Sequence, residues 1–232
     1  MAVGNYYLVT ALPVLGDLGS PPPIPPADLV DHLRGAGARP LVETVFLSDD
    51  LLQRDASLAG EDQPPEPAVL TVAQVQDEEP LPSYLAVGKE AASAREGPAT
   101  DAVWARYFRH AAGVARRHRS PFLETWVGYE VALRNALAIA RAKSLDLDPD
   151  AYVVAAALGD ADADFSALVS EWTDAANPLE GLRVLDRARW QWLQEHDAHF
   201  TFADDELAAY AAKLMLLVRW HRMEQAERKE SE

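Results

Sequence analysis

The chain has 232 residues, 49% hydrophobic and 25% charged, a composition typical of a globular protein that can bury a substantial core. Asp and Glu outnumber Lys and Arg by 37 to 21, and the formal net charge of −16 disfavours binding to nucleic acid or to anionic lipid. The absence of cysteine excludes disulfides, thiolate metal sites and cysteine nucleophiles. It is consistent with a reducing compartment, so we expect a cytoplasmic protein.

The first part of the chain has short apolar segments. Residues 6–12 (YYLVTAL) can form either a strand or a helical turn, and the sequence does not decide between them. Helices are predicted at 27–33 and at 41–54. Within the second helix, we interpret Asp49 and Asp50 as solvated side chains.

Residues 58–82 are acidic and rich in proline (GEDQPPEP and QDEEPLP). This composition predicts a flexible insert in which only 69–75 can form a strand or turn. Its carboxylates lack the spacing of a calcium loop, so we interpret them as solvated. A short helix is expected next, at 84–94.

A helix is predicted from Thr100 to about Arg119, and it ends in the basic run RRHR. Arg116, Arg117 and Arg119 are candidate partner-binding residues, because they form a local basic cluster in an acidic chain. Positive charge at a helix C-terminus also complements the helix dipole, which explains the cluster about as well.

The central element of the predicted fold is a helix over 120–145. Ser120 can cap its first free N–H groups, and Pro121 suits the first helical position. Apolar residues occupy two sides of this helix, and its small alanines allow neighbouring segments to approach closely. We therefore expect the helix to be packed between neighbours.

The polar residues of this helix are predicted to be structural. Glu130 and Arg134 are four residues apart in the favourable order, and Arg141 lies two turns beyond Arg134, so the three form a ladder at the edge of the core. Asn135 lies on an otherwise apolar side, and its amide therefore needs hydrogen-bond partners in a neighbouring segment.

The last third of the chain is also predicted to be helical. Helices are expected from Asp148 to Gly159, from Asp164, from a capping box at 177–180, and from 201–204 onward. Residues 224–232 form a polar tail that is expected to fray or project. These elements predict one mainly all-α domain over 1–232, a multi-helix array around the central helix.

Catalytic and cofactor motifs are not found in the sequence. It has no Gly-rich phosphate loop, no G-x-S-x-G and no HExxH. His196 and His199 are three residues apart, but zinc needs a third ligand from elsewhere, such as His221 or a carboxylate. We therefore expect surface histidines, no metal, no cofactor and no enzymatic activity.

Three stretches together resemble a known family: NYYLVTALPVL near the start, FLETWVGYEVALRNALAIARAK in the middle and FTFADDELAAYAAKLMLLVRWHRMEQ at the end. They resemble the blocks of a bacterial family of uncharacterised function encoded with V/A-type ATPases. That family is in turn similar to the C subunit of archaeal ATPases and the d subunit of vacuolar ATPases. The shared positions are aromatic and apolar, with Glu130, Asn135, Arg141 and the Arg219-Trp220 pair.

The resemblance implies a helical, non-catalytic coupling component that links the central stalk of the ATPase to its membrane rotor ring. Its partners would be stalk and rotor-ring subunits, and it would touch the membrane only through them, at the inner face. The sequence leaves two alternatives. One is a free-standing helical adaptor that binds through the acidic segment or through 116–119, and the other is a metal-dependent hydrolase that uses His196, His199 and acidic residues.

Overall fold

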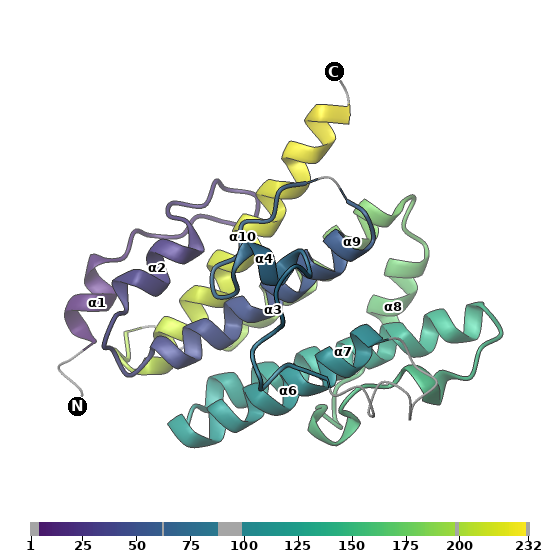
Figure 1. Ribbon diagram of the computed structural model, residues 1–232, viewed down its shortest axis with the longest axis horizontal. Coiled ribbons are helices and arrows are strands. Elements are labelled where there is room, and N and C mark those ends of the chain that lie inside the picture. Colours follow the sequence, from purple (N-terminus) through teal and green to yellow (C-terminus); the bar gives the residue numbers. More distant parts are fainter. Residues whose placement is uncertain (1–4, 62, 88–98, 198–199, 231–232) are drawn as a thin grey trace. The chain divides into compact units, whose positions relative to one another are not determined.

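The computed structural model describes residues 5–61, 63–87, 99–197 and 200–230 (Figure 1). Within these ranges all regular elements are helices, which confirms the predicted mainly all-α fold. The chain divides into two compact units. Unit 1 comprises Met1–Asp50, Glu66–Leu70 and Ser170–Glu232, and unit 2 comprises Leu51–Pro65 and Thr71–Val169. In the described part of the chain, no helix is both long and apolar enough to cross a membrane.

Unit 1 is built around the C-terminal helix, and its elements are α1 (Tyr6–Ala11), α2 (Pro26–His32), the first part of α3 (Arg39–Leu58), the end of α8 (Ser166–Thr173), α9 (Pro178–Glu195) and α10 (Asp204–Glu230). The segment at 6–12, which the sequence left open, is helical over Tyr6–Ala11, and Leu12 is extended. α10 packs against α2 and α9. Its middle turns are buried on nearly every side, because alanines and leucines between 207 and 217 have almost no exposed surface.

α10 extends further than the sequence indicated. The predicted tail at 224–232 is helical as far as Glu230. Glu227 accepts a hydrogen bond from Arg183 of α9, whose guanidinium also bonds Glu180 at 2.7 Å. The polar residues after Met223 therefore continue the helix because one of them is tied to a neighbouring helix.

Unit 2 is built around α7 (Pro121–Ser144), which packs beside α6 (Ala99–His118), as Figure 1 shows. Arg119 turns the chain between them with a left-handed φ of 52°. The Ser120 hydroxyl then accepts a hydrogen bond from the N–H of Leu123 at 3.1 Å. This is the cap that the sequence predicted, and α7 begins at Pro121 as expected.

The helix predicted from Asp148 to Gly159 is wrong. The structure has two short 3₁₀ helices, η1 (Pro149–Tyr152) and η2 (Ala156–Leu158), with Ala155 in a left-handed conformation between them. Val154 explains the interruption, because both its N–H and its carbonyl bond the side chain of Asn135. A backbone residue used in this way cannot continue a helical ladder.

The acidic segment 58–82 is anchored at several points. One helical turn, α4 (Val72–Val75), has a capping box between Thr71 and Gln74. Leu70 and Val75 are buried. The short helix expected at 84–94 is not formed at Tyr84, which lies in a turn, and the rest of that prediction lies mostly outside the described residues.

Candidate functional site

Five charged side chains of unit 1 form one largely buried cluster, defined here as the arginine–aspartate cluster: Asp49, Asp186, Arg189, Arg219 and Arg222. Arg219 donates to Asp186 at 3.0 Å and approaches Asp49 at 3.5 Å. Arg222 donates to both oxygens of Asp49 at 2.6 and 2.5 Å. Arg189 completes the cluster at 3.2 Å from Asp186. The cluster joins α3, α9 and α10.

The two carboxylates of this cluster are buried. Asp186 is 1% exposed and Asp49 is 7% exposed. Within the described part of the chain, Oδ2 of Asp186 has no hydrogen-bond partner, so the arginines bind this carboxylate through Oδ1. Buried carboxylates are tolerated when cations or hydrogen-bond donors of the protein replace water. The prediction that Asp49 is solvated is therefore wrong.

Asp50 is also buried, at 1% exposure, against the prediction that it is solvated. Its carboxylate accepts three consecutive backbone N–H groups, from Ala68 at 2.9 Å and from Val69 and Leu70 at 2.8 Å each. Desolvation raises the pKa of Asp50 to about 6, although the three backbone hydrogen bonds act in the opposite direction. Asp50 thus fastens residues 68–70 to α3.

In unit 2, two of the α7 residues that were predicted to be structural, Arg134 and Asn135, contact other segments of the unit. Asn135 donates to the carbonyl of Val154 at 2.9 Å and accepts its N–H at 2.8 Å. Arg134 pairs with Asp101 of α6 at 2.9 Å. Its guanidinium also lies 4.6 Å from the ring centre of Trp104. Both residues therefore connect α7 to other segments of unit 2.

The remaining residues named from the sequence are mostly at the surface. Glu130 is partly buried and Arg141 is exposed. The candidate partner-binding residues are exposed at the end of α6: Arg116, Arg117 and Arg119. His196 is exposed and stacks on Trp192, and its Nδ1 lies 2.8 Å from the Trp192 carbonyl. His199 lies outside the described residues, and the described residues include no group of three His, Cys, Asp or Glu arranged to hold a metal.

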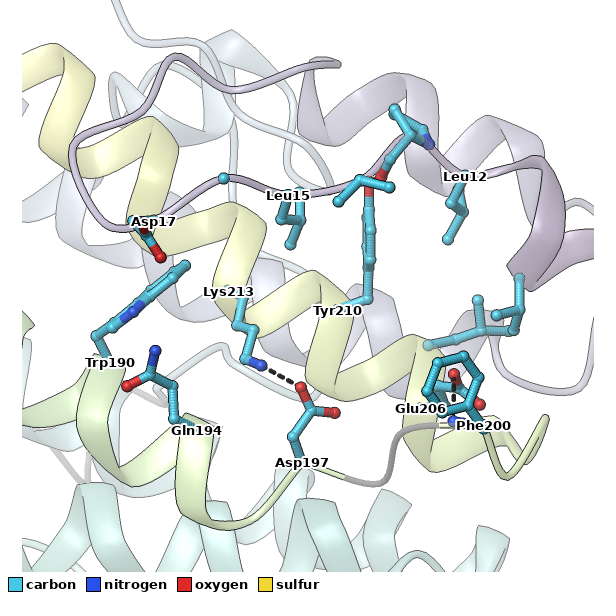
Figure 2. A pocket seen from close by; sticks show the side chains of 15 residues that line it. Leu12, Leu15, Asp17, Trp190, Gln194, Asp197, Phe200, Glu206, Tyr210 and Lys213 are labelled. Atoms are coloured by element: carbon cyan, nitrogen blue, oxygen red, sulfur yellow. Dashed lines mark hydrogen bonds and ion pairs between the residues drawn. The ribbon is translucent and has the colours of Figure 1, made fainter.

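A groove of about 400 Å³ lies in unit 1 between residues 9–17, the end of α9 and the start of α10, and is called the N-terminal groove here (Figure 2). Tyr210 extends from α10 to the N-terminal segment, where its hydroxyl donates to the carbonyl of Pro13 at 2.8 Å. Burial raises the pKa of Tyr210 to about 12, so this donor keeps its proton at physiological pH. Lys213 and Asp197 form a mostly buried ion pair at the groove.

The sequence contained a signal for the arginine–aspartate cluster that our prediction did not use. Asp49 follows Val42, Val45 and Phe46 at helical spacing, and Asp186 shares a stripe with Trp190 and Leu193. An acid within an apolar stripe indicates a buried charge that needs a cation. The sequence does not show which arginine supplies it.

These features describe a mainly all-α protein in which buried polar groups connect helices within each unit. A family model named "Protein of unknown function (DUF2764)" matches residues 68–231. The chain therefore belongs to this family, and the match includes α7, α9 and α10 but not α1 or Asp49. No curated protein and no solved structure matches the chain significantly.

Proposed function

We propose that this protein is a non-catalytic structural component of a V/A-type ATPase and couples the central stalk to the membrane rotor ring, as the C and d subunits do. In this role it lies in the cytoplasm at the inner face of the membrane and is held there by stalk and rotor-ring subunits. The proposal rests on the resemblance of the three sequence blocks. The all-α fold agrees with the fold that this resemblance implies.

One structural observation supports the proposal most. Two polar residues of the blocks connect parts of their own unit: Asn135 bonds Val154, and Arg219 bridges Asp49 and Asp186. Hydrogen bonds and ion pairs between buried groups of different segments hold those segments in fixed positions. A coupling component has to transmit force between its partners without deforming, so rigid helical units suit the role.

Affinity purification of the tagged protein from solubilised membranes of its own host tests the proposal. We expect the head, stalk and rotor-ring subunits of the ATPase to be recovered in comparable amounts, as identified by mass spectrometry. A variant with Arg116, Arg117 and Arg119 replaced by serine, compared with the wild type, tests whether the exposed end of α6 takes part. Recovery of the protein alone, or only with unrelated partners, contradicts the proposal and favours a free-standing adaptor.

A further inference from the structure

We propose that the N-terminal groove of unit 1 binds a basic amphipathic helix of a partner protein. The apolar side of that helix would contact Val14 and Phe200, and its Lys or Arg side chains would lie beside the carboxylates of the groove. This inference does not depend on the proposed ATPase role, because it rests on the shape, exposure and charge of this groove.

The rim of the groove is apolar and open to solvent. Val14 is 92% exposed and Phe200 is 84% exposed, the highest values among the exposed large apolar side chains of the described residues. Both line the groove. Exposed apolar side chains that border a hollow are typical of surfaces that bind another protein.

The backbone holds Phe200 in its exposed position. Phe200 and Phe202 have left-handed φ values of 59° and 51°, which are unfavourable for bulky residues. Glu206 at the start of α10 compensates, because its carboxylate accepts the N–H of Phe200 at 3.0 Å and of Phe202 at 2.7 Å. A strained segment held by such bonds is pre-organised, and pre-organisation lowers the entropic cost of binding.

The charge of the groove selects a basic partner. Three carboxylates line it, those of Asp17, Asp197 and Glu206, and Lys213 is the single lining cation among the described residues. Lys213 already pairs with Asp197. With the chain at a net charge of −16, the surface attracts cationic segments and repels anionic lipid.

The groove is lined on two sides by segments from opposite ends of the chain and has a volume of about 400 Å³. In Figure 2, Leu12 and Leu15 extend from the N-terminal segment on one side, and Gln194 and Asp197 lie on the other. An amphipathic helix fills such a groove with apolar residues at every third or fourth position.

Fluorescence anisotropy with two synthetic helical peptides tests the proposal on the full chain. One peptide contains only Leu and Lys at amphipathic spacing, and the other replaces each Lys with Glu. The protein variants are Val14→Ser combined with Phe200→Asn, since Asn tolerates a left-handed backbone, and Asp17→Asn. Leu182→Ser is the matched control, because Leu182 is 48% exposed on α9 but does not line the groove.

We expect the Leu/Lys peptide to bind and the Leu/Glu peptide not to bind. The double variant should lower the affinity for the Leu/Lys peptide at least tenfold. Asp17→Asn should lower this affinity severalfold and make it less dependent on salt concentration. Leu182→Ser should leave the affinity unchanged. Equal binding of the Leu/Lys peptide to the wild type and the double variant overturns the proposal, because attraction to the overall negative charge then suffices. The proposal is also overturned if the wild type does not bind the Leu/Lys peptide. It is likewise overturned if Phe200 is needed for dimerisation or for binding to lipid vesicles and not for peptide binding.

Discussion

Both units contain polar side chains inside a helical core, but the bonding partners of these side chains differ. In unit 2, the neutral amide of Asn135 on α7 bonds the backbone of Val154, 19 residues away. In unit 1, Arg219 on α10 contacts the buried carboxylate of Asp49, 170 residues away. The neutral amide of Asn135 is bonded by backbone groups alone, whereas the Asp49 carboxylate is bonded by the cations Arg219 and Arg222. Unit 1 should therefore be the more sensitive to loss of a single side chain.

Replacement of Arg219 should have the largest effect. Arg219→Ala leaves Asp186 with Arg189 and Asp49 with Arg222, and it removes the bridge between the two acids. Loss of the charge-assisted hydrogen bond from Arg219 to Asp186, together with its longer contact to Asp49, costs about 3 kcal/mol, the upper end of the range for hydrogen bonds to charged groups. Urea unfolding measures this cost. Arg187→Ala is the control, since Arg187 and Glu171 are more than half exposed and 3.8 Å apart, and it should change stability by less than about 1 kcal/mol. Equal losses in both variants would contradict a special role for the cluster.

Asp50 should make stability depend on pH. Its pKa is raised from the ordinary value of 3.8 to about 6, chiefly by desolvation. Between these values the folded protein binds more protons than the unfolded chain, so the contribution of Asp50 to stability is full below pH 3.8 and is lost as pH rises through about 6. The lost contribution is about 3 kcal/mol.

The comparison of wild type with Asp50→Asn isolates this contribution, because other groups titrate in both proteins. We expect the stability of the wild type to fall more steeply between pH 4 and pH 7 than that of the variant. Parallel curves from urea unfolding at each pH would show that Asp50 keeps an ordinary pKa in the folded state.

Replacement of Asn135 should have a smaller effect. Asn135→Leu leaves the N–H and carbonyl of Val154 without their side-chain partner, at a cost of about 1 to 3 kcal/mol. Arg141→Ala on the same helix should change stability by less than about 0.5 kcal/mol, because Arg141 is exposed. Thermal unfolding of both variants checks the difference. Full stability of Asn135→Leu together with lost partner binding would place Asn135 in an interface instead.

Features that depend on neighbouring residues were predictable from the sequence. The cap of α7 is an example, since Ser120 and the N–H of Leu123 are only three residues apart. The need of Asn135 for a partner followed from its position on an apolar side of α7. The identity of that partner did not, and for this reason the interruption of the helix at 148–159 was missed.

The distant segments that cover the two aspartates of α3 were not predictable from the sequence. Asp49 and Asp50 look alike in sequence, yet Asp50 is covered by residues 68–70 and Asp49 by α10. Nothing near either aspartate indicates these partners. The N-terminal groove was not predictable for the same reason, because residues 9–17 and α10 come from opposite ends of the chain.

The most direct test of the proposed coupling role is purification of the host's V/A-type ATPase through a tag on a catalytic head subunit, followed by quantitative mass spectrometry. We predict that this protein is recovered in an amount comparable with the stalk subunits. The same purification with Arg141→Ala, which preserves stability, tests whether the exposed side of α7 contributes to assembly. An intact ATPase that contains the stalk and the rotor ring but lacks this protein would contradict the proposed role.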